Sequence, residues 1–152
     1  MSTKIVNVLG FVENSEQFVV KTENFKVRIS NNVVVGDQNG PSPVEFLLAG
    51  FAGSINAVGH IVARELKLDL KALQIEISGE LETSKIAGLD TNSRPGLKRI
   101  EVVVKPTTDA SLVVLKQWID TVKERCPLRD SLLNTSSVLL TLVKEYTTSE
   151  VI

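Results

Sequence analysis

The residue best suited to chemistry is Cys126, the one cysteine of the chain. Pro127 suits the first position of a short helix predicted over residues 128–133, so the thiol would stand where that helix begins. The free N–H groups and the dipole there favour the thiolate, and Arg125 and Arg129 add positive charge nearby. Cys126 also falls on the apolar stripe of the preceding helix, and free cysteines are often buried. Packing alone explains both features, so the sequence favours a structural role.

Ser54 and His60 are the next candidates for a nucleophile and a base. They share one predicted helix but are six residues apart, which places them about 120° apart around its axis. The G-x-S-x-G turn of serine hydrolases does not surround Ser54. The pattern therefore does not favour a hydrolase. His60 is better explained as a packed histidine with Asn56 and Arg64 as its neighbours one helical turn away.

Ser54 and His60 depend on a long helix predicted over residues 43–66, after turn-forming residues at 39–42. A helix that is apolar nearly all round is normally buried on all sides. Small residues recur at helical spacing along it and would let a second helix approach closely: Ala49, Ala52, Asn56, Gly59 and Ala63. Residues 46–63 could also cross a membrane by length. Asn56, His60 and three glycines argue against a span, and the first residues lack the layout of a signal peptide.

Composition limits the possible functions. The chain has 152 residues, which suits one domain over residues 1–152. Its net charge of −1 leaves no electrostatic footprint for nucleic acid. One cysteine fits a reducing compartment, one histidine leaves no His-rich metal cluster, and no phosphate-binding loop is present. We therefore expect a soluble cytoplasmic protein with no cofactor and no metal, and with neither nucleic acid nor membrane as a partner.

The remaining pattern predicts an α+β fold. Strands are expected over residues 4–12, 17–21, 25–29, 73–81, 97–105 and 138–143. A second helix is expected to follow a cap at Thr107, Thr108 or Asp109, with Leu112, Leu115, Ile119, Val122 and Cys126 on its buried stripe. The tail from Thr147 is expected to fray. The order is β-β-β-α-β-β-α-(short α)-β, with strands at both ends and helices between, as in α+β proteins.

Two motifs resemble one known family. Residues 40–54, GPSPVEFLLAGFAGS, resemble the G-x-[NS]-P-x-E-L-L-x-A-x-x-G-C opening of the central helix in the OsmC/Ohr family of osmotically inducible and organic hydroperoxide resistance proteins. Residues 126–128, CPL, resemble that family's second cysteine in its Cys-Pro-Val context. The resemblance implies the OsmC-like fold, with two central helices packed on antiparallel or mixed sheets. It also implies an intertwined homodimer whose sites are built from both chains.

The resemblance also implies a chemistry. In the family, one cysteine attacks an organic hydroperoxide as a thiolate, and the second converts the sulfenic acid to a disulfide. Ser54 stands at the first position and Cys126 at the second, so the chain resembles a divergent member that lacks the first cysteine. A glutamate and an arginine orient the first thiolate. Val44 occupies the glutamate position, Glu45 lies nine residues before Ser54 and so about 180° away, and Arg28 is the nearest upstream arginine.

The candidate site therefore consists of Cys126, Ser54, Glu45 and Arg28. We predict that Ser54 and Cys126 lie close together at the buried end of a cleft. One hypothesis is a binding protein for a small apolar ligand in an interface cleft, with a degenerate peroxidase site. The alternative is a one-cysteine, thiol-dependent organic hydroperoxide reductase that acts through Cys126. Whether the protein is an enzyme stays open at this point.

Overall fold

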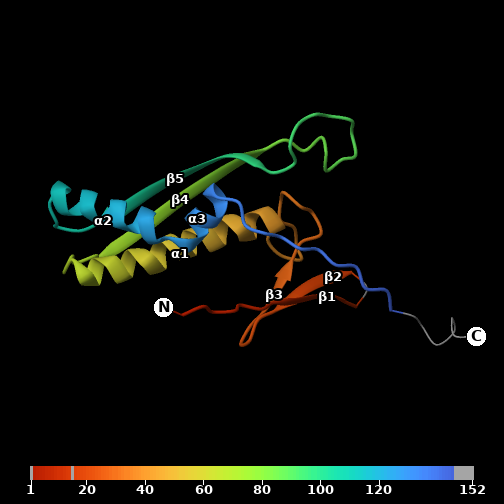
Figure 1. Ribbon diagram of the computed structural model, residues 1–152, viewed down its shortest axis with the longest axis horizontal. Helices are drawn as coiled ribbons and strands as arrows, with labels where there is room; N and C mark the ends of the chain where they lie inside the picture. Colours follow the sequence, from red (N-terminus) through yellow and green to blue (C-terminus); the bar gives the residue numbers. More distant parts are fainter. Residues whose placement is uncertain (1, 15, 146–152) are drawn as a thin grey trace, which may run out of the picture.

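The computed structural model describes residues 2–14 and 16–145. The chain begins with an antiparallel sheet in the order β1-β2-β3, formed by β1 (Leu9–Glu13), β2 (Gln17–Lys21) and β3 (Lys26–Ile29). Helix α1 (Pro43–Glu65) follows, then the antiparallel pair β4 (Ala72–Leu81) and β5 (Leu97–Thr107), and finally α2 (Leu112–Arg125) and α3 (Pro127–Leu133). Figure 1 shows α1 in the middle, with the β4–β5 ribbon on one side and the β1–β3 sheet on the other, near the beginning of α1. The α+β class is confirmed.

The beginning of α1 is fixed by a capping box. The Ser42 hydroxyl accepts a hydrogen bond from the Glu45 backbone N–H, and the Glu45 carboxylate accepts one from the Ser42 N–H. These bonds satisfy two N–H groups that a helix end otherwise leaves free. Pro43 occupies the first turn, where its missing N–H costs nothing. The predicted span of residues 43–66 is therefore correct to within one residue.

The core lies where α1 and α2 meet the β4–β5 ribbon. Trp118 of α2 is 1% exposed, and its indole N–H donates to the Gly59 carbonyl at 2.8 Å. A Cβ at Gly59 would lie 3.1 Å from Cζ2 of Trp118, so the indole packs directly on the α1 backbone. The small-residue stripe of α1 thus lets helix α2 of the same chain pack closely at Gly59.

Two predicted strands do not form as expected. The first begins at Leu9 rather than at residue 4, and Ile5 and Val6 are 84% and 88% exposed. Residues 138–143 are not a strand, and Leu139 is 93% exposed. A strand needs a neighbour for its backbone hydrogen bonds, and neither segment has one within the described part of the chain. The predicted fraying from Thr147 falls outside the described residues.

The predicted cap of α2 was wrong. Its N-cap is Ser111, whose hydroxyl accepts from the Val114 N–H at 3.3 Å. Thr107 instead belongs to β5, where it pairs with Ala72 and accepts a hydrogen bond from the Lys71 N–H. The longer ribbon moves the beginning of α2 beyond the predicted caps.

Helix α1 has the length and composition of a membrane span, and no other helix of the described residues does. A central helix of a soluble protein can have the same length and composition.

Candidate functional site

Ser54 and Cys126 meet, as the sequence predicted. Ser54 lies in the middle of α1, and Cys126 lies between α2 and α3. The Ser54 Oγ and the Cys126 Sγ are 3.2 Å apart, within hydrogen-bond distance for a sulfur atom. Cys126 is 1% exposed and Ser54 is half-buried. Residues 72 positions apart in the sequence therefore form one polar contact inside the helical core.

Cys126 serves two helices at once. Its N–H donates to the Val122 carbonyl at 3.0 Å and ends α2, while its carbonyl accepts from the Asp130 N–H at 3.1 Å and begins α3. Pro127 occupies the first turn of α3, as predicted. The thiol makes no capping hydrogen bond to α3. It contacts Ser54 instead, so both predicted features, the buried stripe and the helix start, are present at this residue.

A cavity of about 320 Å³ lies beside the thiol. This volume falls within the range of small-molecule sites. Two cations, Lys123 and Arg129, stand among a lining that is otherwise apolar apart from the thiol: Phe51, Ile55, Val102, Val104, Ile119, Val122 and Cys126. We call it the thiol cavity. The arrangement can hold a small apolar molecule against the sulfur, with positive charge at the edge.

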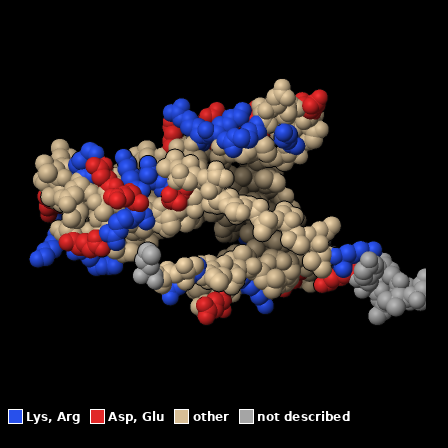
Figure 2. Space-filling model, in the orientation of Figure 1, with Lys and Arg blue, Asp and Glu red and all other residues tan. Residues whose placement is uncertain are grey.

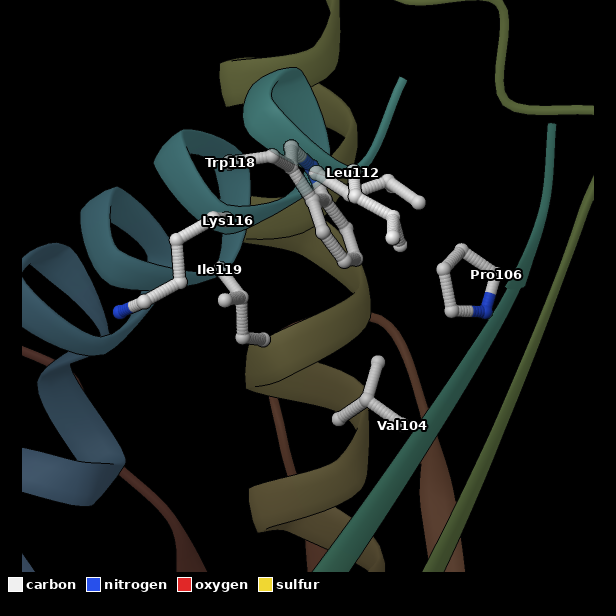
Figure 3. Close-up of a pocket in the computed structure, with 7 residues that line it drawn as sticks. Val104, Pro106, Leu112, Lys116, Trp118 and Ile119 are labelled. Carbon is white, nitrogen blue, oxygen red and sulfur yellow. The ribbon is translucent and has the colours of Figure 1, made fainter. Parts of the chain in front are cut away.

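Two further cavities adjoin the thiol cavity and share its lining. One, of about 470 Å³, shares Val104 and Ile119 and extends to Trp118. Figure 3 shows Trp118 and Ile119 of α2 facing Pro106 and Val104 of β5 across this hollow. The other, of about 450 Å³, shares Phe51, Val102 and Arg129 and extends to the basic residues at the beginning of β5.

Glu45, a predicted site residue, does not contact the Ser54–Cys126 pair. Its carboxylate lies in the capping box, 2.9 Å from the Ser42 backbone nitrogen, and the hydrogen bond from this N–H holds the pKa of Glu45 below 4.5. Nine helical residues separate Glu45 from Ser54, a rise of about 13–14 Å along the axis. The structure thus gives Glu45 a role in capping α1, away from Ser54 as the nine-residue spacing predicted.

Arg28 is exposed on β3 and stands apart from the pair. Within the described residues, neither a hydrogen bond nor an ion pair joins Arg28 to Ser54 or Cys126. Its backbone instead contacts the motif loop, because a Cβ at Gly40 would lie 2.5 Å from the Arg28 carbonyl oxygen. Within a single chain, the fold places Ser54 next to Cys126 but leaves Arg28 away from them. The catalytic role of Arg28 stays a prediction.

Sequence reasoning missed the β5 side of the site. Val102 and Val104 line the thiol cavity, and Lys123 stands at its edge. Half-buried and exposed residues alternate from Ile100 to Lys105, so the apolar residues of this strand that share a face could have been identified. The alternation does not predict which cavity or core this face lines. No group of three or more potential metal ligands occurs among the residues that the structure describes.

Comparisons with known proteins identify the family and the fold. The family model for OsmC-like protein matches residues 36–141. Among solved structures, an OsmC-like protein from Mycoplasma pneumoniae has a TM-score of 0.76 at 19% identity and covers 88% of this chain and 91% of its own. A hypothetical protein from Aquifex aeolicus VF5 has a TM-score of 0.69 at 14% identity, with coverages of 88% and 91%.

An organic hydroperoxide resistance protein, OsmC, from Legionella pneumophila is also similar. Its TM-score is 0.59 at 15% identity, and the match covers 87% of this chain and 91% of that one. At these identities the structural matches establish the fold. No curated protein matches the sequence.

Proposed function

Because the chain belongs to the OsmC-like protein family, we propose that it is a stress-response binding protein whose peroxidase site is altered and whose thiol cavity holds a small apolar ligand. One observation carries the proposal: a serine hydroxyl lies 3.2 Å from the thiol of Cys126, where the family's first cysteine is expected. The fold and the position of Cys126 are kept, whereas the group that would attack the peroxide is replaced.

The replacement removes a defined chemical step. A peroxidatic thiolate attacks the O–O bond and becomes a sulfenic acid, which a second thiol converts to a disulfide with loss of water. A serine hydroxyl is far less acidic than a thiol and forms no sulfenic acid. Cys126 is the chain's one cysteine, so an intramolecular disulfide cannot form. We therefore expect slow or absent organic hydroperoxide reduction with dithiol reductants.

The cavity supports ligand binding in place of that chemistry. Its walls are apolar side chains of α1, α2 and β5, and its volume fits a small molecule. A neutral apolar dye such as Nile red should bind and be displaced by dodecanol. Val104→Trp fills the cavity and should weaken binding strongly. Val103→Trp is the matched control, because Val103 is 48% exposed and is absent from the cavity lining. Equal binding by both variants would contradict the proposed site.

The alternative function is one-cysteine hydroperoxide reduction. Here the Cys126 thiolate breaks the O–O bond, giving a sulfenic acid and an alcohol, and two external thiols then restore the thiol and release water. The position of Cys126 on the cavity wall favours it, because a bound hydroperoxide would meet the sulfur. Reaction of Cys126 with an aromatic disulfide reagent at neutral pH separates the two functions. A fast reaction that prior peroxide treatment quenches supports the reductase, and an inert thiol supports the binding protein.

We also propose that the protein works as a homodimer. Apolar residues at both ends of the described chain are exposed, among them Ile5, Val6, Leu139 and Leu142. Leu47 and Ile61 leave part of α1 uncovered as well, at 44% and 39% exposure. A second copy would bury these surfaces, and an intertwined interface should exceed about 2,000 Å² in total. Light scattering that gives the mass of one folded chain in dilute solution would contradict this proposal.

Cytoplasmic location belongs to the same proposal. Family membership supports a soluble role for the apolar helix α1, and a single free cysteine suits a reducing compartment.

A further inference from the structure

The three adjoining cavities form one groove between β5 and the helices, which we call the β5 groove. Its middle is the thiol cavity, and the shared residues Val104 and Arg129 mark its two junctions. The part near Trp118 is almost wholly apolar, with Leu112, Leu115 and Ile119 on its walls. The three cavities therefore follow one another along β5, from Leu97 to Pro106.

The two ends of the groove differ in charge. Four cations line the end near the β4–β5 loop: Arg94, Lys98, Arg99 and Arg129. Figure 2 shows Lys and Arg side chains gathered over the β4–β5 ribbon near this loop. At the other end the one cation is Lys116, which pairs with Asp120 at 2.6 Å. Among the described residues, no aspartate or glutamate lines any of the three cavities.

Three of the four cations at the basic end form no direct ion pair among the described residues, although the hydrogen bond from Ser84 and the charge of Lys98 both lower the pKa of Glu82. Arg99 pairs with Glu101, whereas Arg94, Lys98 and Arg129 form no ion pair within residues 2–14 and 16–145. Arg94 donates to the Leu97 carbonyl at 2.8 Å, and Arg129 donates to the Lys123 carbonyl at 3.0 Å. Each bond uses one nitrogen and fixes the guanidinium, so other N–H groups are left for a ligand.

Arg129 is the central cation. It is half-buried, and it lines both the thiol cavity and the basic end. A guanidinium matches a carboxylate in a two-bond fork, and such bonds are about twice as strong as neutral ones. A half-buried cation beside apolar walls gains most from an anion that brings an apolar body with it.

We propose that the β5 groove binds a long-chain carboxylate, with its head on Arg129 and its chain passing Cys126 toward Trp118. The inference deepens the proposed function, because it assigns a charge and a direction to the apolar ligand. Charge complementarity carries the choice of occupant: one end is cationic, no acid lines the groove, and the rest is apolar. A neutral chain would fill the walls but leave Arg129 without a counter-charge.

The test compares three compounds with the same twelve-carbon chain: dodecanoate, dodecanol and dodecyltrimethylammonium. Their displacement of Nile red is measured on the intact protein, below each compound's micelle concentration. We expect dodecanoate to bind about tenfold more tightly than dodecanol, as one charge-assisted contact permits, and the cation to bind least well. Raising the salt concentration should reduce the preference for dodecanoate but leave dodecanol unchanged.

Variants locate the head group. Arg129→Gln should bring dodecanoate and dodecanol to similar affinity, and Arg129→Lys should keep part of the preference. Arg64→Gln is the matched control, because it removes an exposed arginine of α1 that does not line the groove. If Arg129→Gln does not fold by circular dichroism, Arg129→Met serves the same purpose, because it keeps an unbranched apolar side chain and removes the charge.

Each outcome bears on one claim. Equal binding of dodecanoate and dodecanol to the wild type overturns the carboxylate inference and leaves the proposed apolar site standing. Full preference in Arg129→Gln, or in Arg129→Met where that variant replaces it, overturns the placement of the head. Failure of all three compounds to bind overturns both the inference and the proposed function.

Discussion

Helix α1 contains two motif serines in very different surroundings. Ser42, at the N-cap, is fully buried, and its hydroxyl accepts from the Glu45 N–H at 3.0 Å and donates to the Val34 carbonyl at 2.8 Å. Ser54, in the middle, is half-buried and makes its one side-chain hydrogen bond in the described structure to Cys126. The first serine completes a closed network, whereas the second faces a thiol next to a cavity.

One part of the motif, around Ser42, stabilises the helix, whereas another part, around Ser54, lies where chemistry could occur. At the beginning of α1, the Ser42 N–H, the Ser42 hydroxyl and the Glu45 N–H all have partners within the chain. At the middle, the Ser54–Cys126 contact lies beside the empty space of the thiol cavity. A chain can therefore keep the motif residues that begin the helix while the reactive residue changes.

The largest expected effect concerns Gly40, in the loop before the cap. Its φ of +149° disfavours any side chain, and a Cβ there would lie 2.5 Å from the Arg28 carbonyl oxygen. Gly40→Ala should destabilise the protein by about 2–3 kcal/mol, measured by urea unfolding. Asn39→Ala, in the same loop, is the control and should change stability by less than about 0.5 kcal/mol. A Gly40→Ala variant as stable as the wild type would show that this loop does not fix the beginning of α1.

The two serines themselves give the next test. Ser42→Ala removes the cap and should cost about 1–2 kcal/mol, because a buried hydroxyl with two partners is lost. Ser54→Ala should cost less than about 1 kcal/mol, because one hydrogen bond to sulfur is lost beside a cavity. Thermal and urea unfolding of both variants show which substitution causes the larger loss of stability. The reverse order would mean that Ser54, not Ser42, holds the fold together.

The smallest effect is a pH dependence at Glu45. Because the hydrogen bond from the Ser42 N–H holds the folded-state pKa of Glu45 below its ordinary value, its stabilising contribution is present above the ordinary pKa and is lost as the pH falls through the folded-state value. Glu45→Gln should therefore lower the melting temperature more at pH 7 than at pH 3. Glu80→Gln, at an exposed position of β4, is the control for removing a surface carboxylate outside the capping box. A Glu45→Gln effect that is equal at both pH values would contradict the ionised capping box.

The sequence predicts the parts of the fold that local signals specify. Pro43 and the Ser42–Glu45 spacing fix the beginning of α1, and Pro127 fixes the beginning of α3. The meeting of Ser54 with Cys126 was also predictable, but from the two motifs of the family and not from periodicity. The contact depends on how α1 and α2 pack, and the approach of Trp118 to Gly59 is one of the contacts that join these helices.

The failures of prediction have a common physical cause. Residues 4–8 and 138–143 have strand-like composition, but a strand also needs a neighbouring edge, which local sequence does not encode. The cap of α2 was misplaced because the pairing of β5 with β4 continues to Thr107. Lys123 was missed for the same reason, since it reaches the edge of the thiol cavity only through tertiary packing, whereas the charge of Arg129 near the thiol was expected from its place in the chain.

The most direct test of the altered site is to restore the missing sulfur. Cumene hydroperoxide consumption with dihydrolipoamide as reductant is compared for the wild type, Ser54→Cys and Ser54→Ala. The 3.2 Å contact predicts that Ser54→Cys forms a disulfide with Cys126 after peroxide treatment, detected by mass spectrometry, and gains measurable turnover, while the wild type and Ser54→Ala remain inactive. Brisk turnover by the wild type that Cys126→Ser abolishes would contradict the account.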